Sequence, residues 1–385
     1  MVNEERLLNY FLDLVRIDSE AYHEREIADK LTADLKALGL DVVEDDAAAK
    51  IGSGAGNLIA TLKGSVSSAQ PILLCSHMDT VVPGRGVKPR VEDGIVRTDG
   101  TTILGGDDKS GLAVIMETLR AIKEQNLAVG DIEVVFTVCE EKGLLGAKAL
   151  DVSRLRSKFG LVFDSDEPGV LYTKAPAGVH FEWKVFGLAA HAGMAPEHGL
   201  SAIQMASVAI ANMKLGRIDF ETTANVGLIN GGMATNIIPQ EVVVQGEARS
   251  RDAQKLDAQV RHMLQCFEDA VAGQEVMIHE GERYKARLEA HHEVAYDAMN
   301  VPDDSSLVRL VQEAGRAMGV EIPIEAMGGA CDANAFNGKG LLVANMGCGM
   351  RDIHTTSEWL DVRDMMKTAH IVQELLRLQA AGPSA

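Results

Sequence analysis

The feature that most constrains the fold of this chain is an apolar run, ILLCSHMDTVV at residues 72–82, that contains a histidine and an aspartate two positions apart. Side chains at positions i and i+2 of an extended strand point to the same side. If residues 72–75 form a buried strand, His77 and Asp79 emerge together at its carboxyl end, where open α/β sheets place their ligand crevices. Because a neighbouring carboxylate can hold one ring N–H of a histidine, the other nitrogen is free to bind a metal ion.

Strand-like and helix-like patterns alternate along the first part of the chain. Apolar residues recur at helical spacing in three segments, 7–15, 27–38 and 112–122. Runs of β-branched residues at 132–139 and 161–163 are typical of buried strands. Such alternation predicts an α/β fold with a mostly parallel, doubly wound sheet.

The pattern changes near Pro176, where apolar and polar residues begin to alternate strictly, as in a half-exposed antiparallel strand. From there the order of elements is β-α-β-β-α-β, with residues 275–284 as the expected last strand, which is the order of a ferredoxin-like α+β unit. The α/β pattern then resumes. The sequence therefore predicts an outer domain made of residues 1–176 and 294–385, with an inserted domain at 177–293.

Acidic residues and histidines follow the predicted strands of the outer domain. They are His77, Asp79, Asp107, Asp108, Glu140, Glu141, Asp164 and His354. Two carboxylates about 4 Å apart repel by roughly 4 kcal/mol at an effective dielectric constant near 20, so several clustered acids would partly protonate without cations. Two divalent ions bring about four positive charges, which three carboxylates and one hydroxide balance while both histidines stay neutral.

This charge balance divides the residues into ligands and one base. The expected ligands are His77 for one ion, His354 for the other, a bridging aspartate from the Asp107–Asp108 pair, and Glu141 and Asp164 to complete the two sets. Glu140 remains as the general base, and Asp79 lies behind His77. The residues alone do not decide which aspartate of the pair is the bridge.

Four blocks extend the argument to a known family. SHMDTV (76–81), LGGDDKSG (104–111), CEEKGLLGAK (139–148) and IHTTSEW (353–359) resemble the metal-site motifs of the M20 family of co-catalytic metallopeptidases, closest to peptidase T. The resemblance covers nearly the whole chain and implies two divalent ions, zinc first, with cobalt or manganese as alternatives. The ligands it implies are His77, Asp107 as the bridge, Glu141, Asp164 and His354. It assigns catalytic roles to Asp79 and Glu140.

The inserted domain resembles the lid or dimerisation domain of that family, through AAHAGMAPEHGLSAI (189–203) and GGMATNIIP (231–239). The resemblance implies that His191 stabilises the oxyanion, that Asn236 contacts the substrate, and that the planar fork of Arg249 holds a substrate carboxylate. It also implies a homodimer through this domain. The residues after His191 differ from those of peptidase T proper and are closer to the carboxypeptidases and deacylases of the family, so the substrate stays open.

The predicted function is hydrolysis of an amide bond in a small peptide, from the amino or the carboxyl end. The alternative within the family is deacylation of an N-acyl amino acid. A non-catalytic relative is disfavoured because both histidines and all the acids are present. A magnesium phosphotransferase is disfavoured because imidazole suits zinc better than magnesium, and because no Gly-rich phosphate loop ending in Lys-Ser or Lys-Thr is present.

Charge and hydropathy exclude other classes of partner. Lys and Arg number 37 against 56 Asp and Glu, and the formal net charge of −19 repels nucleic acid and anionic membranes. The first residues are acidic where a signal peptide is basic, and no apolar run approaches the ~18 residues of a membrane span. Five cysteines without a CxxC motif indicate neither a disulfide framework nor a structural zinc site. We expect a cytoplasmic protein without nucleic-acid or membrane partners.

Overall fold

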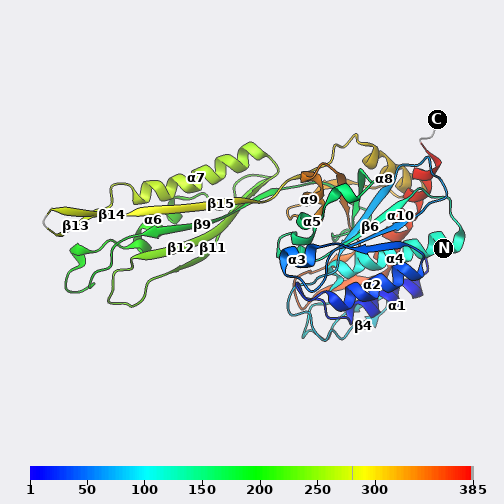
Figure 1. The fold of residues 1–385 in the computed structure, drawn as a ribbon, viewed down its shortest axis with the longest axis horizontal. Coiled ribbons are helices and arrows are strands. Elements are labelled where there is room, and N and C mark those ends of the chain that lie inside the picture. The colour runs from blue at the N-terminus through cyan, green and yellow to red at the C-terminus, as the bar shows by residue number, and fades with distance from the viewer. Residues whose placement is uncertain (280, 383–385) are drawn as a thin grey trace. The chain divides into compact units, whose positions relative to one another are not determined.

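The computed structural model describes residues 1–279 and 281–382, and the chain forms two compact units (Figure 1). Unit 1 comprises Met1–Ala175 and Met299–Ala385, and unit 2 comprises Pro176–Ala298. The sequence places the second boundary after residue 293, five residues before the end of unit 2 at Ala298. The difference arises because strand β15 (Arg287–Tyr296) belongs to the sheet of unit 2 along its whole length.

Unit 1 is built on a 9-stranded sheet in the order β1-β2-β6-β3-β7-β18-β8-β16, with β17 paired to β8. Its strands are β1 (Asp41–Glu44), β2 (Leu58–Leu62), β3 (Ile72–His77), β6 (Ile132–Thr137), β7 (Phe159–Val162), β8 (Leu171–Ala175), β16 (Met299–Asn300), β17 (Ile324–Ala326) and β18 (Leu342–Met346). The four central strands, β6, β3, β7 and β18, run parallel. The predicted α/β fold with a mostly parallel sheet is confirmed.

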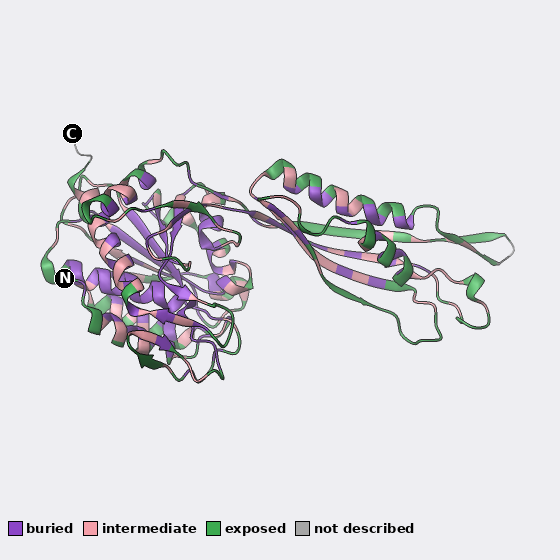
Figure 2. Ribbon diagram, turned by 180° about the vertical axis from the view of Figure 1, so that it is seen from behind, coloured by how far each residue is buried: buried purple, intermediate pink, exposed green. Residues whose placement is uncertain are grey.

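Helices surround this sheet, and Figure 2 shows the central strands buried and the outer faces of the helices exposed. The helices are α1 (Glu4–Val15), α2 (Arg25–Ala37), α3 (Ala47–Ile51), α4 (Gly106–Gln125), α5 (Leu145–Ala149), α8 (Ser306–Ala317), α9 (Asp332–Gly338) and α10 (Val362–Ala381). Helix α4 packs against β3 and against both α1 and α10. Its apolar stripe is buried on several sides, because every residue from Gly106 to Leu119 is buried.

A small second sheet in unit 1 positions the segment that contains His354. Its order is β19-β20-β5-β4. The strands are β4 (Arg90–Glu92), β5 (Ile95–Arg97), β19 (Met350–Arg351) and β20 (Trp359–Asp361). Strands β19 and β20 pair antiparallel, so residues 352–358 form the loop that joins them.

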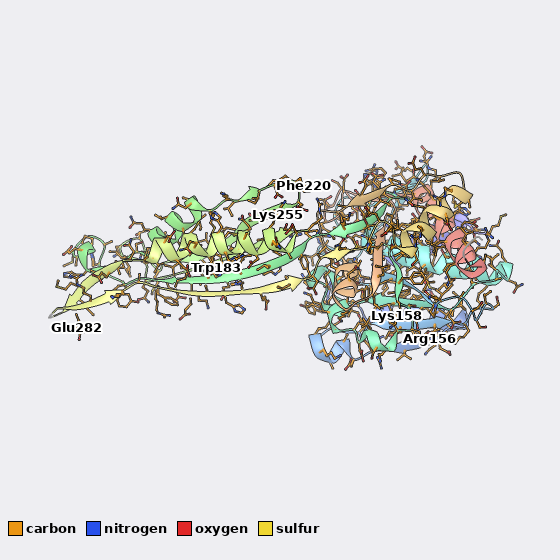
Figure 3. All side chains as sticks on the ribbon, turned by 90° about the horizontal axis from the view of Figure 1, so that it is seen from above. Arg156, Lys158, Trp183, Phe220, Lys255 and Glu282 are labelled. Carbon is orange, nitrogen blue, oxygen red and sulfur yellow. The ribbon has the colours of Figure 1, made fainter. Side chains whose placement is uncertain are left out.

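Unit 2 is a 5-stranded sheet in the order β10-β11-β12-β9-β15, with helices α6 and α7 packed against it. The remaining bounds are β9 (Ala177–Phe186), α6 (Ala202–Asn212), β10 (Gly216–Arg217), β11 (Thr222–Gly231), β12 (Glu241–Ser250) and α7 (Ala253–Val271). Trp183, labelled in Figure 3, stacks on Phe181 at 4.1 Å between ring centroids and meets the edge of Phe267 from α7 at 5.2 Å. These rings centre the core between sheet and helix.

The prediction that residues 275–284 close the unit is wrong. Strands β13 (Glu275–His279) and β14 (Glu282–Lys285) pair only with each other, and β15 takes the place beside β9. Gly273 at φ +72° lies in the turn from α7 into β13, and Gly281 at φ +90° lies directly before β14, where the segment folds back on itself. In the part of the chain that is described, no helix is long and apolar enough to cross a bilayer.

Candidate metal centre

The predicted site residues of unit 1 leave the same edge of the central sheet. In the parallel register, His77 at the end of β3 lies beside Thr137 at the end of β6, and Cys75 lies beside Val162 at the end of β7. The carboxyl ends of these three strands therefore coincide. Glu140 and Glu141 follow β6, Asp164 follows β7, and Asp107 lies in the first turn of α4.

Asp107 lies between two imidazole rings. Its Oδ1 is 3.0 Å from Nε2 of His77, and its Oδ2 is 3.1 Å from Nε2 of His354. The same Nε2 of His354 is 3.0 Å from Oε1 of Glu141. One carboxylate thus presents its two oxygens to two histidines that are 277 positions apart in the chain, as a ligand that bridges two ions does.

Three overlapping groups of side chains could each hold an ion. They are His77 with Asp107 and Asp164, His77 with Glu140 and Glu141, and Asp107 with Glu141 and His354. In each group the possible ligand atoms lie within 4.8 Å of one another. Two imidazoles and four carboxylates are suitable donors for zinc and similar ions.

Asp108 points elsewhere. Its Oδ2 accepts hydrogen bonds from the Ser76 hydroxyl at 2.6 Å and from the His77 N–H at 3.3 Å, and its Oδ1 accepts one from the Gly111 N–H at 3.2 Å. These bonds hold the start of α4 against the end of β3. The structure therefore places Asp107 in the cluster and gives Asp108 a structural environment.

Asp79 contacts both His77 and the segment after β6. The backbone oxygen of Asp79 is 2.9 Å from Nδ1 of His77, whereas its carboxylate is 3.5 Å away. The carboxylate instead accepts the N–H of Glu140 at 2.9 Å and the N–H of Glu141 at 3.1 Å. With Nδ1–H donating to the carbonyl, Nε2 of His77 keeps its lone pair toward Asp107. The sequence predicts that Asp79 lies behind His77. It does not reveal that the Asp79 carboxylate accepts the backbone N–H groups of Glu140 and Glu141.

The charges of the cluster are balanced either by protons or by cations. Burial raises the pKa of the Glu140 and Asp164 carboxyls well above their usual range, and repulsion from neighbouring carboxylates adds to it. Hydrogen bonds with Asp107 and Glu141 raise the pKa of His354 to about 10. Divalent cations would replace these protons, leaving the acids ionised and the imidazoles neutral. The donor set therefore fits two such ions.

Glu358 supports the site and was missed in the sequence. Gly105, the residue before α4, has no side chain to cap the helix. The buried carboxylate of Glu358 accepts the N–H groups of Leu104, Gly105 and Asp107 at 2.7, 2.8 and 3.1 Å. Burial raises its pKa to about 7. Glu358 lies four residues after His354, within the motif IHTTSEW, and this position in the sequence could have indicated its role.

The remaining predicted residues lie in unit 2. Nδ1 of His191 accepts the N–H groups of Gly193 and Met194 at 3.2 and 3.1 Å, so the ring proton of the neutral imidazole lies on the exposed Nε2. Asn236 is close by, since its backbone carbonyl accepts the N–H of Ala192 at 2.9 Å.

Arg249 lies on β12. Its guanidinium pairs through two bonds of 2.9 Å with Glu247 and lies 5.9 Å from the ring centre of Tyr296. The fork of Arg249 is thus already engaged with one carboxylate, in the geometry that a bound carboxylate would take.

A parallel α/β sheet with imidazoles and carboxylates gathered at its carboxyl edge defines a metal-dependent hydrolase. Residues 73–378 match the model of peptidase family M20/M25/M40, and the chain belongs to this family of metallopeptidases. The family that the sequence motifs indicate is confirmed.

The alignments with similar proteins extend over nearly the whole chain. The Bacillus subtilis (strain 168) protein YqjE is 45% identical over 377 residues, which are 98% of this chain and 99% of that protein. The crystal structure of aminopeptidase PepT from Bacillus cereus ATCC 10987 is 42% identical, with a TM-score of 0.89 over 99% of both chains. That of a tripeptidase from Staphylococcus aureus subsp. aureus Mu50 is 40% identical, with a TM-score of 0.92 over 99% of this chain and 100% of that one.

Proposed function

We propose that this metallopeptidase removes a residue from the end of small peptides with the help of two divalent ions, zinc before cobalt or manganese. The observation that carries the proposal is the Asp107 carboxylate, whose oxygens lie 3.0 and 3.1 Å from the imidazoles of His77 and His354. The similar solved structures of an aminopeptidase and a tripeptidase support a peptide substrate.

The proposed ligands follow the two groups that contain Asp107. Asp164 completes the site of His77, Glu141 completes the site of His354, and Asp107 is shared. When bound, two divalent ions would polarise the scissile carbonyl and lower the pKa of a bound water molecule.

Glu140 acts as the general base and then as the general acid. It is 8% exposed, and its backbone N–H is fixed by Asp79. Its carboxylate takes a proton from the attacking water and delivers it to the leaving amine, since one group can serve both steps. His191, with Nε2–H free to donate, binds the carbonyl oxygen as negative charge develops there.

Asn236 contacts the substrate, and Arg249 binds a substrate carboxylate that replaces Glu247 on its guanidinium. Replacing Arg249 by alanine should raise KM for peptides with a free carboxyl end more than for the same peptides with an amidated end. An equal rise for both would remove Arg249 from carboxylate recognition.

A homodimer through unit 2 is part of the proposal. Strand β10 covers only Thr223 and Ala224 of β11, so residues 225–231 present an edge that no other described strand pairs with. Leu228 and Ile229 on this edge are 56% and 49% exposed. An open edge with exposed apolar side chains favours pairing with a second chain.

The five cysteines support a cytoplasmic location. All of them are free and buried. Thiols without disulfide partners are typical of a reducing compartment.

The test of the reaction uses the purified, zinc-loaded chain and its Glu140→Gln variant on a panel of tripeptides, dipeptides and N-acetyl amino acids. We expect tripeptide or dipeptide hydrolysis by the wild type, and a loss of kcat of at least about 10³-fold in the variant with both zinc ions retained. Preferred cleavage of N-acetyl amino acids would favour deacylation instead. Substantial turnover by the variant would remove Glu140 as the base.

A further inference from the structure

The segment that carries Glu140 and Glu141, residues 138–146, has an unusual backbone; we call it the glutamate loop. Cys139 and Leu144 have φ values of +51° and +61°, in the left-handed region that side chains with a Cβ rarely adopt. Cys139 directly precedes Glu140, so its conformation sets the direction in which Glu140 leaves β6. Such a conformation persists only when the surroundings hold it.

Buried side chains from outside the loop hold four consecutive N–H groups of it. Asn57 accepts that of Val138, Glu24 accepts that of Cys139, and Asp79 accepts those of Glu140 and Glu141. Asn57 also donates to the carbonyl of Gly146 at 3.0 Å, which fixes the other end. The loop also makes backbone hydrogen bonds within itself, from Leu145 to Cys139 and from Gly146 to Val138. The side chains of Asn57, Glu24 and Asp79 add tertiary contacts that these internal bonds cannot replace.

Glu24 makes the contact at the left-handed residue. Its Oε1 accepts the N–H of Cys139 at 3.1 Å and the thiol of Cys139 at 3.0 Å. The same oxygen accepts the N–H of Tyr22 at 3.0 Å, and Oε2 accepts the Ser53 hydroxyl at 2.7 Å.

Glu24 stands at the start of a helix, but its carboxylate does not cap that helix. Glu24 is the N-cap residue of α2, a position where a shorter side chain such as Asp or Ser accepts an N–H from the first turn. Here the side chain makes no such bond. It is fully buried and is turned toward Cys139 instead.

We propose that Glu24 is a positioning residue for peptide hydrolysis, which sets the position of Glu140 by holding Cys139 in its left-handed conformation. The inference rests on the proposed function in one respect, the role of Glu140 as the base. Glu24 itself touches neither the substrate nor the proposed ligands; it acts through the backbone of Cys139.

The test compares Glu24→Ala and Glu24→Gln with a matched control, Glu133→Ala. Glu133 is also a buried glutamate that fastens a loop, because it accepts the N–H groups of Arg156 and Ser157 and the Ser157 hydroxyl. It lies at the opposite end of β6 from the glutamate loop. Loss of either glutamate should therefore lower stability, but only one loss should disturb Glu140.

Peptide hydrolysis is measured with excess zinc and with the zinc content of each protein determined. We expect Glu24→Ala to lower kcat by about 100-fold at nearly unchanged KM, as a misplaced catalytic group does. Glu24→Gln should keep kcat within about fivefold, because the amide oxygen still accepts both N–H groups and the Ser53 hydroxyl can accept from the amide. Glu133→Ala should match the wild type in kcat.

Amide exchange of residues 138–146 provides a second measurement that does not depend on activity. It should accelerate in Glu24→Ala and not in Glu133→Ala.

A kcat for Glu24→Ala equal to that of the control, or a loss explained wholly by missing zinc, would overturn the proposal. If the wild type lacks peptidase activity, the proposed function fails, and unchanged exchange in the loop would then overturn the role of Glu24 independently. If Glu24→Ala does not fold, Glu24→Asp, too short to reach Cys139 and Ser53 together, takes its place.

Discussion

Replacing Glu358 by glutamine tests whether one buried carboxylate fixes the start of α4 and, with it, Asp107. Oε2 accepts two N–H groups, those of Leu104 and Gly105, and Oε1 accepts the N–H of Asp107. A glutamine can turn its single oxygen toward the first pair, and its NH₂ group then faces the Asp107 N–H as a second donor. The variant therefore loses one of the three hydrogen bonds and leaves a buried donor unsatisfied.

The expected cost follows from that count. A buried N–H without an acceptor costs about 1–3 kcal/mol. For a domain of this size, that corresponds to a fall in Tm of about 2–12 °C. Glu358→Leu, which leaves all three donors without an acceptor, should cost about three times as much. Zinc affinity should fall in the same order, because Asp107 is the shared ligand of the proposed centre.

The assay is thermal unfolding followed by circular dichroism, with and without zinc, together with zinc titration of the folded variants. Glu92→Gln is the control, because Glu92 is exposed on the edge strand β4 of the same unit. A Tm and a zinc affinity of Glu358→Gln indistinguishable from those of this control would refute the reasoning.

Three further predictions concern the metal, the dimer and acid stability. Removing zinc with a chelator should lower Tm, since each site at 100 times its Kd contributes about 2.7 kcal/mol; an unchanged Tm would contradict a folded-state metal centre. Leu228→Asp should convert the proposed dimer to a monomer in sedimentation velocity, whereas Glu293→Gln, an exposed control, should not; a wild type that sediments as a monomer would contradict the dimer. Although burial raises the pKa of Asp131, the Gly64 N–H, Arg156 and Lys63 lower it overall to about 2. The stability from Asp131 is therefore present above about pH 4 and lost as pH falls toward 2. The Tm deficit of Asp131→Asn should accordingly shrink over that interval, and a constant deficit would exclude the ion pairs as its cause.

Local sequence could predict the strand that ends at His77, because a continuous apolar run followed by polar residues specifies a buried strand and its exit. It could also predict most of the acids at the sheet edge. It could not distinguish Asp107 from Asp108, which are adjacent and chemically identical. The choice depends on Ser76 and Gly111, whose hydrogen bonds turn Asp108 away from the cluster.

The closing strand of unit 2 shows the same limit. Residues 275–284 and 287–296 are both strand-like by local pattern, yet only the second pairs with β9. Pairing is decided by long-range register and by glycine turns at 273 and 281, and local propensity does not contain this information.

By itself, the sequence determined which chemical groups are present and which short segments are strands or helices, because side-chain chemistry and hydrophobic period are local properties. Only the tertiary structure decided which groups meet. Glu24 lies 115 positions from Cys139, and Glu358 lies 251 from Asp107. Hydrogen bonds over such separations form only once the whole sheet has brought the segments together, so the supports of the site emerge from the fold alone.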